Sequence, residues 1–279
     1  DHTADLDLCI RSIVEKATWK NLEFIIVENN SGDPETFAYY DKIQKEFDFV
    51  RVVKWEREFN YSAINNFGVT FARGQYLLFL NNDTELINPE SIEEMLGFCQ
   101  RDDVGIVGVR LLYSDDTIQH AGVVVGFGGI AGHTFIGLHK AESSYFNRAM
   151  CAQDYSAVTA ACMMSKRSLF DQVGGFSEDL AVAFNDIDYC MKIRSLNKLV
   201  VYAPYALFYH YESKSRGLED TPEKVARFNR EIRKFADKWP EILEKGDPYY
   251  NPNLTLRKSN FALRDLKKEK IGEPYKLEV

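Results

Sequence analysis

Asn81, Asn82 and Asp83 form a polar cluster that directly follows the apolar run Tyr76–Leu80. Such a cluster is costly to bury, so we expect it at the mouth of a strand. Two interpretations are open from these residues alone. The Asp83 carboxylate could cap the following turn, or it could bind a divalent metal, because Mg²⁺ and Mn²⁺ are commonly held by one or two carboxylates together with substrate phosphates.

Asp186 and Asp188 lie in the first turn of a helix predicted over residues 185–196. Acidic side chains stabilise a helix N-terminus, which is one explanation for both. The other is that Asp186 acts as a general base. Residues two apart do not share a helix face, so the two carboxylates should have different roles.

His210 follows an apolar strand and precedes Lys214 and Arg216. These residues form either a solvated basic loop or a group that binds phosphate. Three amides, Asn60, Asn65 and Asn66, gather near one predicted helix start. Capping explains an amide at position 60, but asparagine is a poor helix former and capping does not explain the other two.

Alternating helices and strands must position these side chains. In the first 110 residues this alternation predicts a mostly parallel sheet with helices on both faces. Ligands bind beyond the carboxyl ends of such strands, where Glu28–Ser31 and Asn81–Asp83 would form a pocket. Helices are predicted over residues 5–17, 35–47, 62–74 and 89–100, and strands over 22–28, 49–55, 75–80 and 104–109.

Size and composition exclude several classes of protein. The 279 residues suit one large domain or two small ones, and a formal net charge of -8 argues against a nucleic-acid partner. The five cysteines form no CxxC pair, which argues against a disulfide framework or a structural zinc site. No apolar run approaches the length of a membrane-spanning helix, so we expect a soluble cytoplasmic chain that could lie at the inner face of the membrane.

The order of these pieces resembles the family 2, GT-A-type glycosyltransferases. The resemblance covers about residues 1–240. Within the family, the sequence most resembles bacterial polysaccharide and O-antigen transferases of the rhamnosyltransferase-like kind. It rests on four segments: "FIIVENNSGD", "NYSAINNFGVTFARGQYLLFLNNDTEL", "YSAVTAACMMSKRSLFDQVGGFSEDLAVAFNDIDYCMKIRSL" and "ALFYHYESKSRG".

The resemblance implies an α/β, Rossmann-like GT-A fold and its domain organisation. The glycosyltransferase domain would span residues 1–245, with a nucleotide-binding half over 1–110 and an acceptor-binding half over 111–245. Residues 246–279 would form a C-terminal extension. Family members open with a strand before a segment like Asp1–Leu6, so the resemblance also implies that the first strand of the sheet is missing from this sequence.

The resemblance also implies a role for each candidate residue. Asn81–Asp83 occupies the place of the family's Asp-X-Asp motif, with Asp83 as metal ligand, and His210 matches a residue that approaches the metal or diphosphate. Asp186 matches the catalytic base. The nucleotide-sugar set would comprise Glu28, Asn30, Asn60, Asn65, Asn81, Asn82, Lys214 and Arg216.

The implied activity is that of an inverting, metal-dependent hexosyltransferase. It would use Mn²⁺ or Mg²⁺ and move a sugar from a nucleotide-diphosphate sugar to a glycan or lipid-linked glycan acceptor in cell-surface polysaccharide synthesis. The alternative is a catalytically silent nucleotide-sugar-binding module of a larger multidomain synthase, because Asn81 and Asn185 stand where the family has acids. A nucleotidyltransferase would need a Gly-rich phosphate loop near the first strand.

Overall fold

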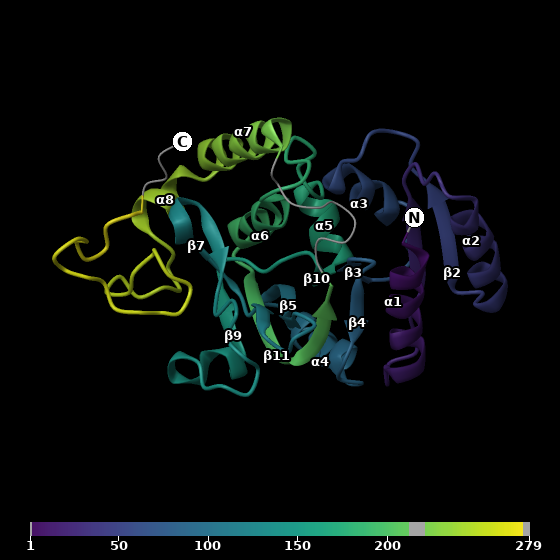
Figure 1. The fold of residues 1–279 in the computed structure, drawn as a ribbon, viewed down its shortest axis with the longest axis horizontal. Coiled ribbons are helices and arrows are strands. Elements are labelled where there is room, and N and C mark those ends of the chain that lie inside the picture. The colour runs from purple at the N-terminus through teal and green to yellow at the C-terminus, as the bar shows by residue number, and fades with distance from the viewer. Residues whose placement is uncertain (1, 212–220, 276–279) are drawn as a thin grey trace.

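The structure is a computed structural model that describes residues 2–211 and 221–275. Figure 1 shows helices packed around a central sheet, with the chain running from α1 on one side to a C-terminal segment on the other. Up to residue 112 the elements are α1 (Thr3–Lys16), β1 (Phe24–Glu28), α2 (Pro34–Glu46), β2 (Val50–Lys54), α3 (Tyr61–Val69), β3 (Tyr76–Leu80), β4 (Thr84–Leu86), α4 (Ser91–Cys99) and β5 (Val104–Leu112).

The second half contains several three-residue strands, the long strand β11 and four further α-helices among the described residues. The elements are β6 (Ile118–His120), β7 (Val123–Val125), η1 (Phe127–Gly129), β8 (Ala131–His133), η2 (Tyr145–Met150), β9 (Gln153–Tyr155), β10 (Cys162–Lys166), α5 (Arg167–Val173), α6 (Asn185–Ser195), β11 (Leu199–His210), α7 (Pro222–Lys238) and α8 (Pro240–Lys245).

The α/β class predicted from the sequence is confirmed, but the main sheet is mixed rather than mostly parallel. Its seven strands run β3-β10-β5-β11-β4, with β6 and β9 paired at the sides. Only β5 and β11 are parallel neighbours in it, and β10 is antiparallel to both β3 and β5. The alternation of the first 110 residues did not specify β10, because the chain reaches that strand only after the long excursion through residues 113–161.

The strands β1 and β2 form a separate parallel pair. The sequence predicted that Glu28 and Asn81–Asp83 lie at one edge of one sheet. This is wrong, because Glu28 ends a strand of the two-stranded sheet and Asn81 follows a strand of the seven-stranded sheet. No strand among the described residues pairs with both β1 and β3, so the ladder is interrupted between them. Helix α3 packs against β1 and α1 packs against β4, which joins the two sheets through helices.

The core lies on both faces of β5, whose nine residues are all buried. One face packs against α4 through Ile92, Met95 and Leu96, and the other packs against α5 and α6. Four of the five cysteines are buried fillers, and Cys151 is exposed. Within the described residues, every helix is too short or too polar to cross a bilayer.

Local chemistry explains where several helices begin and end. Asp33 accepts a hydrogen bond from the Glu35 N–H and Pro34 occupies the first turn, so α2 starts as capping rules require. Helix α5 stops at Gly174, whose φ of 72° is readily adopted by glycine. Helix α3 ends at Val69, five residues before the glycine predicted to stop it, through the C-cap Thr70.

The segment after α8 packs against the β7–β8 hairpin. The buried Asp247 carboxylate accepts hydrogen bonds from the Val125 N–H and the Ser156 hydroxyl. Burial raises the pKa of Asp247, against these hydrogen bonds, which lower it. The Phe261 ring stacks on Phe135 with centroids 4.8 Å apart. The boundary predicted at residue 245 therefore separates segments that share a packed surface, and the division into domains stays a prediction.

Candidate active site

Asp83 and His210 meet where β3, β4 and β11 end. Strand β3 stops at Leu80, a tight turn places Asp83, and β4 pairs antiparallel with β11, so that His210 lies opposite Thr84. The Asp83 Oδ1 and His210 Nε2 atoms are 3.2 Å apart, and the two residues are 8% and 6% exposed. The structure thus brings together the two residues that the sequence predicted as metal ligands.

Gln119 fixes the orientation of the His210 ring. Its side-chain amide N–H donates to the His210 carbonyl at 3.3 Å, which leaves its Oε1 facing His210 Nδ1 at 2.6 Å. This contact suits a proton on Nδ1, and in the neutral ring with that tautomer Nε2 carries the lone pair. The Asn81 side-chain amide lies 3.1 Å from Nε2 and donates to it in this tautomer.

This arrangement fits a divalent cation. In the Nδ1–H tautomer, His210 Nε2 and the Asp83 carboxylate are both acceptors, 3.2 Å apart, and an ion bound to Nε2 would replace the Asn81 hydrogen bond. An octahedral ion with ligand distances of about 2.1 Å places neighbouring ligand atoms about 3 Å apart. Among the described residues, no cluster of three His, Cys, Asp or Glu could hold a metal, so the remaining ligands would come from substrate phosphates and water.

Helix α1 packs against the turn between β3 and β4 that carries Asp83. The Cys9 thiol lies 3.4 Å from the Thr84 hydroxyl and 3.7 Å from the Asn81 carbonyl. Burial raises the pKa of Cys9 to about 11, so it packs as a neutral thiol. The Ser12 hydroxyl accepts from the Leu86 N–H, which fixes β4 against α1.

Asp186 lies in the first turn of α6 and is half-buried. Its carboxylate accepts hydrogen bonds from its neighbour Ile187 N–H at 2.8 Å and from the Ala160 N–H at 3.2 Å. Ala161, the next residue, accepts through its carbonyl from the Asn81 N–H at 2.9 Å. The backbone of Ala160 and Ala161 therefore connects Asp186 to Asn81, which lies beside Asp83 and His210.

Asp188 makes different contacts from Asp186, as expected for residues two apart on a helix. It is fully buried and accepts hydrogen bonds from the Ser177 hydroxyl and the Trp239 indole N–H. Lys192 and Lys238 lie 3.9 and 3.8 Å from its carboxylate. These contacts anchor α6, so Asp188 is a structural residue of the helix that carries Asp186.

Glu28 and Asn30 shape the turn after β1. The buried Glu28 carboxylate accepts from the Ser31 N–H at 2.6 Å, and the Asn30 side chain donates to the Arg57 carbonyl at 2.9 Å. Asn30 itself has a φ of 54°, a left-handed conformation that asparagine tolerates. Nucleotide binding by Glu28 and Asn30 stays a prediction.

The amides of α3 hold the loop that leads to α6. The Asn60 side chain accepts from the Ala63 N–H as the helix N-cap and donates to the Glu178 carbonyl. Asn66 donates to the Phe176 carbonyl and accepts from the Phe176 N–H. Asn65 donates to the Tyr61 carbonyl of its own helix. These contacts explain the amides within the protein, and a role for Asn60 and Asn65 in nucleotide binding stays a prediction.

Three predicted residues remain, Asn82, Lys214 and Arg216, and the structure describes only the first of them. Asn82 is exposed in the turn between β3 and β4. Lys214 and Arg216 lie outside the described residues. Gln119 was missed by sequence reasoning, because nothing within its own segment, Ile118–His120, signals a contact with the distant His210.

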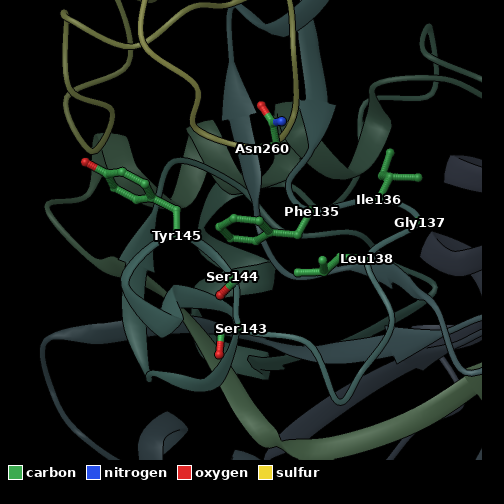
Figure 2. Close-up of a pocket in the computed structure, with 8 residues that line it drawn as sticks. All are labelled: Phe135, Ile136, Gly137, Leu138, Ser143, Ser144, Tyr145 and Asn260. Carbon is green, nitrogen blue, oxygen red and sulfur yellow. The ribbon is translucent and has the colours of Figure 1, made fainter.

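A separate cavity of about 320 Å³ lies away from all predicted site residues. Figure 2 shows its lining, with the Phe135 and Tyr145 rings, the hydroxyls of Ser143 and Ser144, and the Asn260 amide around it. It is formed by the segment after β8, the start of η2 and the C-terminal segment.

Sequence comparison gives one family match and two long relatives. Residues 3–174 match the family model described as glycosyl transferase family 2. The chain is 45% identical over 264 residues to the uncharacterized protein y4gI of Sinorhizobium fredii, covering 94% of this chain and 29% of y4gI. It is 37% identical over 265 residues to the O-antigen biosynthesis protein RfbC of Myxococcus xanthus, covering 91% of this chain and 20% of RfbC. The chain thus spans less than a third of either relative.

Two solved structures resemble the fold. GalNAc-T7 with UDP, GalNAc and Mn²⁺ superposes with a TM-score of 0.64 at 14% identity, covering 86% of this chain and 49% of that chain. The mannosyltransferase PcManGT from Pyrobaculum calidifontis, with GDP-Man and Mn²⁺, gives a TM-score of 0.60 at 15% identity, covering 84% of this chain and 61% of the other. At these identities the likeness concerns the fold alone.

Proposed function

The chain belongs to glycosyl transferase family 2, and on that premise we propose that it is an inverting, metal-dependent transferase. It moves a sugar from a nucleotide-diphosphate sugar to a glycan or lipid-linked glycan acceptor in cell-surface polysaccharide synthesis. The fold is of the GT-A type, as the sequence predicted, and the enzyme class is that of a glycosyltransferase. The name of the RfbC relative supports the polysaccharide setting.

One observation supports the proposal: the candidate base Asp186 and the candidate cation ligands Asp83 and His210 lie at the two ends of one short backbone connection. Asp186 contacts the Ala160 N–H, and the Ala161 carbonyl contacts the Asn81 N–H beside Asp83 and His210. A displacement reaction needs a base on the acceptor side and positive charge on the leaving-group side. In the proposed reaction, Asp186 in the first turn of α6 would supply the base, and a cation held by Asp83 and His210 would supply the positive charge.

The residues would divide the work as follows. Asp186 takes the proton from the acceptor hydroxyl, whose oxygen forms a bond to the anomeric carbon as the bond from that carbon to the diphosphate oxygen breaks. The leaving nucleoside diphosphate keeps the electron pair, and a single displacement inverts the configuration. Asp83 and His210 would hold Mn²⁺ or Mg²⁺, which when bound offsets the charge that builds on the diphosphate.

The donor contacts on this proposal come from both sheets. Glu28 and Asn30 after β1, Asn60 and Asn65 on α3, and Asn81 and Asn82 after β3 would surround the nucleotide sugar. Lys214 and Arg216 would bind its phosphates. An acidic chain with a net charge of -8 needs such local positive groups to hold a doubly charged donor.

The test uses Asp186→Asn, which keeps the size of the side chain and removes its basicity. A panel of UDP-, GDP- and dTDP-linked sugars is titrated by calorimetry with and without Mn²⁺, and turnover is followed by mass spectrometry. We expect donor binding within about twofold of wild type and a loss of turnover of at least about 10²-fold. The matched control is Asp171→Asn on α5, whose side chain is 60% exposed, and it should leave both values unchanged.

A catalytically silent binding module is the second candidate, because Asn81 and Asn185 stand where acids would be expected in this family. The buried Asn185 side chain donates to the Val182 carbonyl, so its present contact is structural. Donor binding by the wild-type chain with no turnover on any acceptor would favour this candidate. Failure of every nucleotide sugar to bind would contradict both.

A further inference from the structure

Glu231 of α7 binds the loop that precedes α6, the helix that carries the candidate base Asp186. It is 3% exposed, and its two carboxylate oxygens accept hydrogen bonds from three consecutive backbone N–H groups. The distances are 3.0 Å to Ala181, 3.2 Å to Val182 and 2.8 Å to Ala183. Hydrogen bonds from backbone N–H groups to an ionised carboxylate are among the stronger ones in proteins.

The bound segment ends three residues before Asp186. The turn at Phe184 has a φ of 61°, a conformation that is uncommon for a bulky residue and persists only when its surroundings enforce it. The surroundings come from α7, because the Phe184 ring lies 5.4 Å from the ring centroid of Phe228 and 5.7 Å from that of Phe235. In Figure 1, α7 lies at the top of the view, above α6.

The other side of the same loop is held by α3. The Ser62 hydroxyl donates to the Leu180 carbonyl at 2.7 Å, and the Tyr61 N–H donates to the Ala181 carbonyl at 2.8 Å. The carbonyls of Leu180 and Ala181 are therefore bound by α3, and the N–H groups of residues 181–183 are bound by Glu231. A clamp of this kind fixes where α6 begins, and with it the position of the Asp186 carboxylate against Ala160.

We propose that Glu231 is a positioning residue for the transfer reaction: through residues 181–183 it sets the place of Asp186. The inference rests on the proposed function, since it assumes that Asp186 is the base. Glu231 itself would contact neither donor nor acceptor, because its carboxylate is already directed at the loop. Small displacements of a reacting group can cost about 10²-fold in rate without weakening substrate binding.

The test compares Glu231→Gln with Ile232→Ala, its neighbour on the same helix. Glutamine keeps the size of the side chain but replaces one acceptor oxygen with an amide group that cannot accept from the loop. Ile232 is 5% exposed and packs in the core, so its truncation destabilises α7 without removing a hydrogen bond to residues 181–183. Both variants are assayed well below their unfolding temperatures.

For Glu231→Gln we expect kcat to fall by about 10- to 100-fold with the donor KM within about twofold. Amide hydrogen exchange at residues 181–183 should become faster, a readout that does not depend on activity. Ile232→Ala should keep kcat within about twofold and lose more thermal stability. If Glu231→Gln fails to fold, Glu231→Asp serves instead, because it keeps the charge on a shorter side chain. It should lower kcat and speed amide exchange at residues 181–183 in the same way but by less.

Two results would overturn the positioning role. One is a wild-type kcat in a folded Glu231 variant while Asp186→Asn is inactive, and the other is a kcat loss no larger than that of Ile232→Ala. Full activity of Asp186→Asn is a distinct result: it refutes the base assignment in the proposed function and the inference that depends on it.

Discussion

Replacing Gln119 with leucine should weaken metal binding at Asp83 and His210 without touching either ligand. The substitution removes both side-chain hydrogen bonds to His210, the one to Nδ1 at 2.6 Å and the one to its carbonyl at 3.3 Å. Gln119 is 3% exposed and His210 is 6% exposed, so water has little access to replace these contacts. The His210 ring would be free to rotate or to move its proton to Nε2, the atom that faces Asp83.

Two independent estimates give the size of the effect. Leaving a buried donor such as the His210 Nδ1–H unpaired costs about 1–3 kcal/mol. Removing the partner that orients a metal-ligating histidine typically lowers metal affinity by about 10–100-fold, which corresponds to about 1.4–2.7 kcal/mol. The estimates agree, and we therefore expect a Mn²⁺ dissociation constant about 10–100-fold higher in Gln119→Leu.

The assay is Mn²⁺ titration followed by electron paramagnetic resonance, in the presence of the nucleoside diphosphate that binds most tightly. Gln153→Leu is the matched control, because the Gln153 side chain also makes two hydrogen bonds, to the Arg148 and Cys151 carbonyls, outside the site. It should bind Mn²⁺ as wild type does. A Gln119→Leu protein that is folded and binds Mn²⁺ within twofold of wild type would refute the assignment of Gln119 as the residue that orients His210.

Three further predictions follow from the same structure. Asp83→Ala should make donor binding insensitive to Mn²⁺ or EDTA in calorimetry; a retained metal response would place the cation elsewhere. Gly122→Ala should lower the free energy of unfolding by about 1–3 kcal/mol in urea, because a Cβ there would lie 2.3 Å from the Tyr155 ring at a φ of 102°; Gly128→Ala, also at positive φ but with open space, should cost less. Burial, and then the nearby His133 and His210, hold the pKa of His120 well below its ordinary value of 6.5. Below pH 6.5 the unfolded chain takes up a proton at His120 that the folded chain does not, so the free energy of unfolding falls by up to about 1.4 kcal/mol per pH unit. His120→Gln should reduce this slope. An unchanged slope would contradict a neutral buried His120.

Local elements were predictable because their signals lie within a few residues. The apolar run of β3 stops where Asn81 begins, and the Asp33-Pro34 pair marks the start of α2. The amphipathic pattern of α7, Pro222–Lys238, likewise lies within its own residues. Glu231 carried a readable signal, a charge on the apolar face of that helix between Phe228 and Phe235, but only the structure shows what it binds.

The order of strands could not be read in the same way. Residues 162–166 pair with residues 76–80 across a long stretch of chain, and no periodicity within either segment identifies the other. The same limit applies to Gln119, whose partner His210 is 91 residues away. The resemblance to a family identified Asp83, His210 and Asp186 as candidates, because it compares whole patterns rather than local ones.

The distance along the chain between Asn81 and His210 has a consequence for folding. These residues are 129 positions apart and meet only when β11 has joined β4 at the end of the sheet. Contacts of such sequence separation form late, since loop closure must precede them. The Asp83–His210 pair therefore cannot form while only the first half of the chain has emerged from the ribosome. A cation bound there would slow unfolding and raise the melting temperature, but it would leave the refolding rate nearly unchanged.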